Sequence, residues 1–342
     1  MKNKRITIKD IAKELKISAS TVSRALNNHP SLKQETITSV KKLARKLNYQ
    51  PNLLALNLLQ KRSNTIAIIV PEITSHFFST AITAIQDVLV STDYNSVICL
   101  SNESFKEEKE IVNKLSRIHI DGVLVSPSSK TKNYSHFENL QNLGIPVVIF
   151  DRDCKGLEAD KVLVDDYYGA YKAVEYLIKS GCKNVAHIGG PKNLSTTLHR
   201  LNGYLDALKD NGIPVCDDYI VHASGYNILD GIKPSNKLLQ LKNRPDAIFA
   251  INDSIAIAAM RTAEKLNYSI PDDISIIGFD DEPHAAHFAP SLSTIFQPVY
   301  SMGMLSARIL LSHLTDDDKA SSGFRYEVFQ PELVLRDSSR KI

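Results

Sequence analysis

The chain has 342 residues, enough for two to three domains, and 43% of them are hydrophobic, which is ample material for buried cores. Its net charge of +3 is unevenly distributed. Residues 1–62 carry 14 Lys/Arg and 3 Asp/Glu, a net +11, whereas the remaining 280 residues carry 27 and 35, a net −8. The basic segment is therefore expected to meet a polyanion, and the acidic body is not.

The distribution of cysteine and apolar residues excludes further classes. The four cysteines are widely spaced without a CxxC pair, the N-terminus lacks an apolar signal region, and no apolar run approaches the ~20 residues of a membrane helix. We expect a cytoplasmic protein with free thiols, no disulfide framework and no membrane partner.

Residues 6–26 predict two short helices joined by a tight turn. Thr7 and Asp10 stand at capping-box spacing, and the apolar residues that follow share one helical face: Ile8, Ile11, Ala12 and Leu15. Ser18 can cap the second helix. Its outward side chains are small or hydrogen-bonding apart from one guanidinium: Ala19, Ser20, Ser23 and Arg24. Such a helix fits a major groove, where Arg24 can pair with guanine. A surface helical hairpin with a solvated arginine is the alternative.

A third helix is predicted over residues 33–48, with a basic outer face that adds non-specific phosphate attraction. Pro51 ends this region. Residues 53–60, LLALNLLQ, are apolar nearly all round, and a segment of fewer than about 12 residues does not hold a helix alone in water. This segment therefore needs a partner, either its own twin in a dimer, an apolar surface on the ligand, or both.

From residue 66 onward, short β-rich runs alternate with helical segments. Their Val/Ile content is typical of parallel strands covered on both faces, and the alternation predicts βαβ units. The runs are 66–71, 96–101, 121–126, 145–151, 161–166, 184–190, 247–253, 274–281 and 293–298. About ten strands exceed one comfortable sheet, so we expect two similar doubly wound lobes. Ligands in such folds bind at the carboxyl ends of the strands.

The chain resembles the lactose-repressor/purine-repressor (LacI/GalR) family of bacterial transcription regulators in several motifs that occur in the family's order. The opening run Thr7-Ile8-Lys9-Asp10-Ile11-Ala12 is followed by ISASTVSR (17–24), and LNYQPN (47–52) matches the family's domain boundary. IAIIVPEITSHFF, ISIIGFDD and STIFQP resemble the first and the late strands of its effector domain. The likeness covers residues 6 to 338.

The resemblance implies which head residues contact DNA. Positions that read base edges correspond to Ala19, Ser20 and Arg24. Positions that hold phosphates correspond to Thr7, Ser18, Thr21, Ser23 and Asn27. Lys16, in the turn between the first two helices, replaces a frequent Gly or Asn. If its backbone is left-handed, the cost is about 1–2 kcal/mol.

Residues 53–60 correspond to the family's hinge helix, which enters the minor groove when it is paired across a dimer. Ala55 keeps the family residue, and Leu58 matches a leucine that is wedged between base pairs and kinks the duplex. Leu56 departs from a common arginine, which puts one minor-groove contact in doubt.

The resemblance also implies a periplasmic-type sugar-binding body whose cleft binds a small effector. Carried over position by position, the cleft is lined by Ser75, Phe77, Phe78, Ser126, Asp151, Arg152, Arg200, Tyr226, Asp253 and Gln297. Aromatic faces stack on a sugar ring, while Asp and Arg offer planar hydrogen-bonding partners to vicinal hydroxyls or to a carboxylate. No metal or other cofactor is indicated.

The sequence thus predicts an N-terminal all-α helix-turn-helix head and an α/β periplasmic-binding-protein-like body of two doubly wound lobes. The head comprises residues 1–50, the hinge 51–62 and the body 63–342. Within the body we expect an N-lobe of residues 63–162 and 292–323 and a C-lobe of residues 163–291 and 324–338.

The expected function is that of a homodimeric transcription regulator, a repressor, which binds a palindromic operator on the nucleoid under control of a sugar or related metabolite. Two alternatives belong to other classes. An enzyme is disfavoured because no HExxH, GxSxG, P-loop or GxGxxG motif occurs, and acidic pairs such as Asp280-Asp281 stand at strand ends, where solvated or capping Asp is usual. A solute receptor without a DNA role is disfavoured by the basic head.

Overall fold

The computed structural model describes residues 6–49, 63–118, 120–315 and 323–342. The chain divides into two compact units, Met1–Ser63 and Asn64–Ile342. Among the described helices, none is both long and apolar enough to cross a lipid bilayer. All four cysteines are free thiols.

The head contains the three predicted helices, α1 (Ile8–Leu15), α2 (Ala19–Leu26) and α3 (Gln34–Lys46). Their apolar faces form one core of Ile11, Ala12, Val22, Ala25, Ile37, Val40, Leu43 and Ala44. The Asp10 carboxylate accepts hydrogen bonds from the backbone N–H and the hydroxyl of Thr7, at 2.8 and 2.7 Å. Lys16 follows α1 as its C-cap with a φ of 53°, so its backbone is left-handed and the cost of about 1–2 kcal/mol applies.

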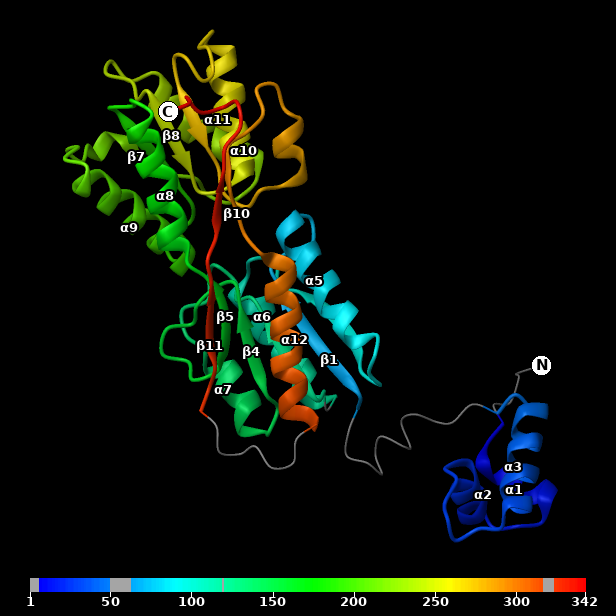
Figure 1. The fold of residues 1–342 in the computed structure, drawn as a ribbon. Coiled ribbons are helices and arrows are strands. Elements are labelled where there is room, and N and C mark those ends of the chain that lie inside the picture. Colours follow the sequence, from blue (N-terminus) through cyan, green and yellow to red (C-terminus); the bar gives the residue numbers. More distant parts are fainter. Residues whose placement is uncertain (1–5, 50–62, 119, 316–322) are drawn as a thin grey trace. The chain divides into compact units, whose positions relative to one another are not determined.

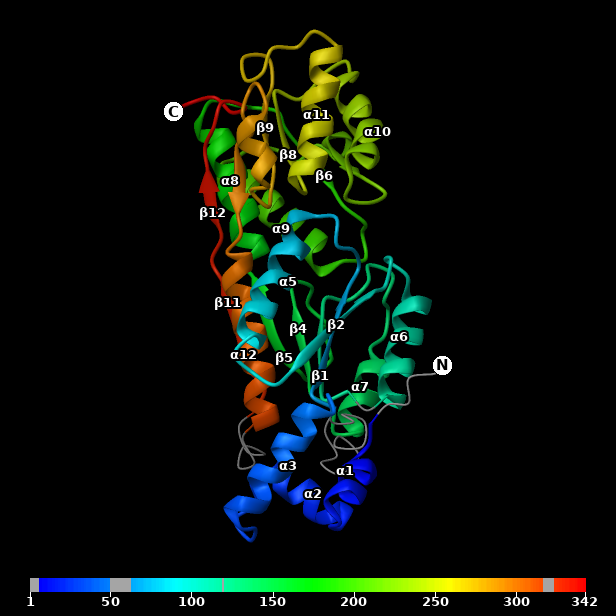
Figure 2. The same cartoon turned by 90° about the vertical axis from the view of Figure 1, so that its right-hand side faces the viewer.

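The first lobe of the body is a six-stranded parallel sheet in the order β11-β5-β4-β3-β1-β2. Its strands are β1 (Thr65–Val70), β2 (Asn95–Leu100), β3 (Gly122–Val125), β4 (Val147–Phe150), β5 (Asp160–Val164) and β11 (Tyr326–Phe329). Its helices are α5 (His76–Leu89), α6 (Phe105–Arg117), α7 (Ser135–Asn142) and α12 (Val299–Thr315). One face packs on α5 and α12 (Figure 1) and the other on α6 and α7 (Figure 2), as expected for strands rich in Val and Ile.

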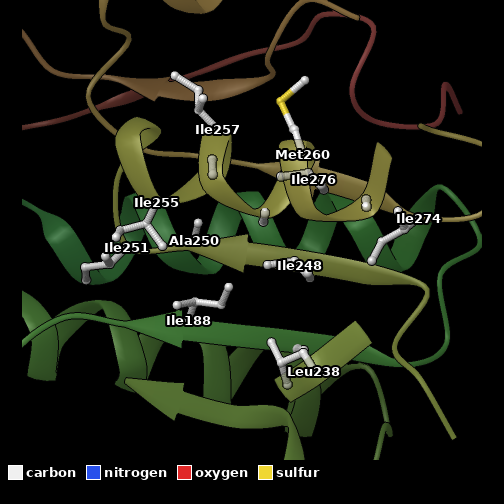
Figure 3. Close-up of a cluster of buried hydrophobic side chains, with 14 of the residues drawn as sticks. Ile188, Leu238, Ile248, Ala250, Ile251, Ile255, Ile257, Met260, Ile274 and Ile276 are labelled. Atoms are coloured by element: carbon white, nitrogen blue, oxygen red, sulfur yellow. The ribbon is translucent and has the colours of Figure 1, made fainter. Parts of the chain in front are cut away.

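The second lobe has a four-stranded parallel sheet in the order β7-β6-β8-β9. Its strands are β6 (Val185–Gly189), β7 (Ile220–His222), β8 (Ala247–Ala250) and β9 (Ser275–Ile277). Its helices are α8 (Asp166–Lys179), α9 (Ser195–Asp210), α10 (Ile228–Leu239) and α11 (Asp253–Lys265). The core on the α10 and α11 side includes Ile188, Leu238, Ile248 and Ile255 (Figure 3).

Helices α8 and α9 cover the opposite face of this sheet, and Gly203 allows their close approach. A Cβ at Gly203 would lie 2.3 Å from the carbonyl oxygen of Tyr167 and 2.9 Å from the backbone nitrogen of Tyr171. Because both obstacles are backbone atoms, no side-chain rearrangement can make room. The helix pair therefore depends on glycine at this position.

The chain passes between the two lobes three times. The first crossing comes after β5, and the second comes after the short strand β10 (Thr294–Phe296). The third connects β11 to β12 (Glu332–Val334). Strands β10 and β12 pair antiparallel, and β10 also lies along the second lobe, where the N–H groups of Gly278 and Asp280 donate to the carbonyls of Ser293 and Ile295. Two 3-10 helices, Asp217–Tyr219 and Pro283–His287, complete the described elements.

The predicted architecture is confirmed, but the lobe boundaries differ in detail. Residues 324–338 are predicted to belong to the C-lobe, whereas β11 pairs in parallel with β5 in the first-lobe sheet. Residues 292–323 are predicted to belong to the N-lobe, whereas β10 lies against the second lobe. All nine predicted strand runs contain a strand, and β7, β11 and β12 were not anticipated.

Candidate functional site

The exposed face of α2 forms the candidate DNA-reading surface of the head. Ala19, Ser20 and Arg24 are exposed, as contacts to base edges require. The Ser18 hydroxyl caps α2 by accepting the N–H of Thr21 at 3.1 Å, and it also lies 2.8 Å from the hydroxyls of Ser20 and Thr21. The start of this helix thus gathers hydroxyl groups around free backbone N–H groups, an arrangement suited to phosphate.

The remaining predicted DNA contacts fall into two groups. Thr7 and Asn27 are exposed at the N-terminus of α1 and the C-terminus of α2, and Ser23 is half-buried on α2. Ala55 and Leu58 lie outside the described residues, so their assignment stays a prediction.

A cavity of about 470 Å³ lies between the two lobes of the body. Eight of the ten predicted effector residues line it: Ser75, Phe77, Phe78, Asp151, Arg152, Arg200, Tyr226 and Gln297. They come from the carboxyl ends of strands and the helix starts beyond them, which is where ligands bind in doubly wound sheets. Ser75, for example, caps α5 by accepting the N–H of Phe78 at 3.4 Å.

Ser126 and Asp253 are the two predicted residues that do not line the cavity. Ser126 is buried and donates to the Asp151 carboxylate at 2.8 Å, so it supports a wall residue from behind. Asp253 is fully buried at the start of α11, where it accepts from the Thr294 hydroxyl at 2.5 Å and from the Glu282 N–H at 2.8 Å. Burial raises its pKa well above the ordinary range of a carboxyl. Asp253 therefore holds the second lobe to its crossing strand, and the walls are formed by Asn252 and Ser254 beside it.

Arg152, in the first lobe, is ion-paired with a neighbouring carboxylate. Its two terminal nitrogens lie 3.1 and 2.8 Å from the oxygens of Glu103, and Nη1 also donates to the Pro127 carbonyl at 2.9 Å. Its Nε lies 3.5 Å from Asp151. Burial disfavours the charged guanidinium, but Glu103 and Asp151 outweigh this effect and raise the pKa of Arg152.

Arg200, in the second lobe, is also paired with a carboxylate, that of Asp166, through its Nε alone. Its Nε donates to Asp166 at 2.7 Å and its Nη1 to the carbonyl of Ile251 at 2.5 Å. The guanidinium carbon lies 3.5 Å from the centre of the Phe279 ring. The terminal nitrogens of Arg152 are thus both engaged within the protein, while Arg200 is engaged through Nε and Nη1.

Asp151 and Asp280 extend the acidic wall from opposite lobes. Both have positive φ angles, 69° and 115°, which are uncommon for residues other than glycine. Burial raises the pKa of Asp151 to about 6 and that of Asp280 to about 8, although Arg152 and Arg200 act in the opposite direction. The interpretation of the Asp280-Asp281 pair as solvated or capping is wrong for Asp280, which lines the cavity and accepts from Gln297 at 2.7 Å. Asp281 instead pairs with Arg336 at 2.6 Å.

Several wall residues were not anticipated: Glu72, Thr74, Glu103, Ser129, Lys130, Pro191, Thr196, Ser224, Gly225, Asn227, Asp230, Asn252, Ser254, Asp280 and Glu282. The rule that polar residues follow strand ends finds Glu72, Asn252 and Asp280. The same rule points to the loop after β2 that carries Glu103, whereas Asp230 lies on a helix and no local signal marks it. Among the described residues, no three or more His, Cys, Asp or Glu side chains are grouped to hold a metal.

Comparison with known protein families agrees with both parts of the chain. The model for bacterial regulatory proteins of the lacI family matches residues 7–52, and a periplasmic binding protein-like domain matches residues 174–339. A ribose operon repressor from Halalkalibacterium halodurans is 32% identical over 98% of this chain and 97% of its own length. A probable HTH-type transcriptional repressor, ExuR, from Bacillus subtilis is 34% identical over 98% of this chain and 99% of its own.

Solved structures show the same fold. A lac repressor dimer bound to operator and the anti-inducer ONPF covers 99% of this chain and all of its own, with 22% identity and a TM-score of 0.86. A LacI family regulator from Enterococcus faecium with bound ribose covers 81% of this chain and 99% of its own, with 28% identity and a TM-score of 0.70. The full-length relatives are transcriptional repressors, not enzymes, and the match at residues 7–52 sets aside a receptor without a DNA role. The chain belongs to the LacI family of bacterial regulatory proteins.

Proposed function

We propose that this DNA-binding transcription regulator is a cytoplasmic repressor whose operator affinity is controlled by a polyhydroxylated metabolite, a sugar or a close relative, bound between its lobes. The observation that carries the proposal is the composition of the cavity: carboxylates, amides and hydroxyls of both lobes surround it, together with aromatic rings. A ligand that presents many hydroxyl groups and a flat, less polar face suits such walls.

Aromatic side chains support this class of ligand. Phe78 of the first lobe and Tyr226 of the second both line the cavity, and the Arg152 guanidinium carbon lies 5.8 Å from the centre of each ring. These rings can stack on the apolar face of a sugar, while Asp151 and Asp280 accept hydrogen bonds from its hydroxyls. Relatives point the same way, since one is named a ribose operon repressor and one solved neighbour is a CelR–cellobiose complex.

Control of DNA binding follows from a ligand that touches both lobes. Such a ligand stabilises one lobe separation over another, and an equilibrium can shift only by the difference in ligand affinity between the two states. We propose that a homodimer reads a palindromic operator with its two α2 helices, and that lobe separation sets the pairing of the predicted hinge at residues 53–60. A coupling of about 1–3 kcal/mol is typical of such regulators.

The test begins with selection of an operator from random oligonucleotides by the full-length protein. Operator affinity is then measured by fluorescence anisotropy with and without each member of a panel of sugars, sugar acids and sugar phosphates. We expect one sequence family to be enriched and at least one compound to change its affinity five-fold or more. Enrichment of no sequence would contradict operator binding, and a panel without effect would contradict the ligand class.

Arg24→Ala is the matched variant for the DNA arm of this test. Loss of one bidentate contact to guanine costs about 1–3 kcal/mol for each half-site, so specific binding should fall by a factor of ten or more. Ligand binding, measured by thermal shift on the same variant, should remain. A parallel loss of ligand binding would contradict the proposal that the head binds DNA and the body binds the effector independently.

A further inference from the structure

The two arginines of the cavity are both held by carboxylates of the protein. Arg152 meets both carboxylate oxygens of Glu103, and Arg200 meets Asp166. Both guanidinium side chains are more than nine-tenths buried, with 8% and 6% of their surface exposed. A carboxylate or phosphate on a ligand would therefore find the bidentate face of Arg152 already occupied, and would find Arg200 already engaged by Asp166 and the Ile251 carbonyl.

The rest of the wall adds further negative charge. Glu72, Asp151, Asp230 and Glu282 line the same cavity, and among the described residues that line it Lys130 is the only other cation. A partly buried cleft with a surplus of carboxylates repels anions, and the low local polarity strengthens that repulsion relative to water. An uncharged polyol meets no such penalty, because its hydroxyls donate to the same carboxylates.

Glu103 occupies its place through several contacts of its own. It lies in the loop between β2 and α6 with a φ of 53°, and its Oε2 accepts the N–H of Ser129 at 2.6 Å as well as the Arg152 donor. It thus joins the loop after β2 to the loops after β3 and β4. Burial opposes its ionisation, but the charge and the hydrogen bonds of Arg152 and the hydrogen bonds from Ser129 outweigh burial and leave the pKa of Glu103 lowered.

We propose that Glu103 determines ligand charge: by neutralising Arg152 it makes the cleft select uncharged polyols over anionic ones such as uronates and sugar phosphates. This inference rests on the proposed function, because it narrows the ligand class of the same cavity. Glu103 acts as a specificity-determining residue, and its contribution is electrostatic exclusion rather than shape.

The first arm of the test uses matched sugar pairs with full-length wild-type protein. Glucose is compared with glucuronate and glucose 6-phosphate, and ribose with ribose 5-phosphate, by thermal shift and by calorimetric titration. We expect the neutral member of any pair that binds to bind at least tenfold more tightly than its anionic counterpart. Equal or tighter binding of the anionic member would overturn the inference and leave the proposed function intact.

The second arm compares Glu103→Gln with Glu110→Gln. The first substitution keeps an oxygen for the Ser129 N–H and removes the charge opposite Arg152. The second removes an exposed charge from α6, away from the cavity. In Glu103→Gln, the ratio of anionic-sugar affinity to neutral-sugar affinity should rise about tenfold, whereas Glu110→Gln, which lies outside the cavity, should leave that ratio and both affinities unchanged.

This second arm decides the inference even if wild-type protein binds none of the sugars. A gain of glucuronate or sugar-phosphate binding in Glu103→Gln alone would support charge exclusion by Glu103, although the sugar class itself would then be contradicted. The inference would be overturned if Glu103→Gln left the preference between anionic and neutral sugars unchanged. It would also be overturned if Glu110→Gln altered this preference as much as Glu103→Gln does. Thermal unfolding of both variants without ligand reports whether either substitution disturbs the fold.

Discussion

At the scale of single residues, Asp280 makes the stability of the body depend on pH. Burial raises the pKa of Asp280 to about 8, so the folded chain holds this proton up to a higher pH than the unfolded chain, whose Asp titrates near ~4. Between these values the folded state binds more protons, and stability therefore falls as pH rises. One such carboxyl contributes a slope of at most about 1.4 kcal/mol per pH unit.

We therefore expect Asp280→Asn to flatten the decline in melting temperature between pH 5 and pH 8. Asparagine keeps an oxygen for Gln297 but cannot ionise. Differential scanning calorimetry of wild type and variant across this range measures the difference. An identical slope in both proteins would assign the pH dependence to another group, of which Asp151 is the first candidate.

Asp253 is a residue whose role the structure revises, and it yields a second prediction. Because its carboxylate joins Thr294 to the N–H of Glu282, Asp253→Ala should lower the free energy of unfolding by about 1–3 kcal/mol. Asp253→Asn keeps one of the two acceptor oxygens and the shape of the side chain, and should cost less. Urea unfolding monitored by circular dichroism distinguishes them. If Asp253→Ala instead leaves stability unchanged and abolishes ligand binding, Asp253 contacts the ligand.

At the scale of elements, the turn between α1 and α2 has a strained backbone at Lys16 that a substitution can relieve. Lys16 has a φ of 53°, a conformation that costs a residue with a Cβ about 1–2 kcal/mol and costs glycine almost nothing. Lys16→Gly removes this cost, but glycine loses more backbone entropy on folding, which offsets part of the gain. The substitution should therefore stabilise the head by up to about 1 kcal/mol. Amide hydrogen exchange in α1 and α2 of the full-length protein should slow accordingly. Faster exchange would show that the Lys16 side chain stabilises the turn.

The elements also show what sequence reasoning could and could not establish. Buried parallel strands such as β1 and β3 have a continuous apolar pattern, and the helices of the head have caps and apolar periodicity, so both were predictable. Strand β7 has only three residues, too few for a periodic signal, and β11 pairs with a strand more than 150 positions earlier in the chain.

The same limit applies within the cavity. Matching a family motif places a residue in the chain but does not set the direction of its side chain. At the start of α11, the extended N-cap Asn252 and the helical Ser254 line the cavity, while Asp253 between them is fully buried. Glu103 is brought to Arg152 from 49 positions away, and only the folded structure reveals that pairing.

At the scale of the whole molecule, the division of charge predicts different salt dependences for the two ligands. The first 62 residues carry a net +11, so operator binding should release many counterions. Raising salt from 50 to 200 mM should weaken operator affinity by a factor of about a hundred or more, while affinity for an uncharged effector stays within about twofold. Anisotropy and calorimetric titrations at matched salt test both. Salt-insensitive operator binding would contradict phosphate contact by the head.

The late position of β11 also bears on how the protein is made. The first-lobe sheet gains its outer strand only when residues 326–329 have been synthesised, long after the head and β1 to β5. At roughly 5–20 residues per second, that delay is on the order of ten seconds or more. Throughout it, β5 presents an open edge that can pair with other nascent chains. Premature termination before residue 326 is therefore expected to yield aggregates instead of DNA binders that no longer sense their effector.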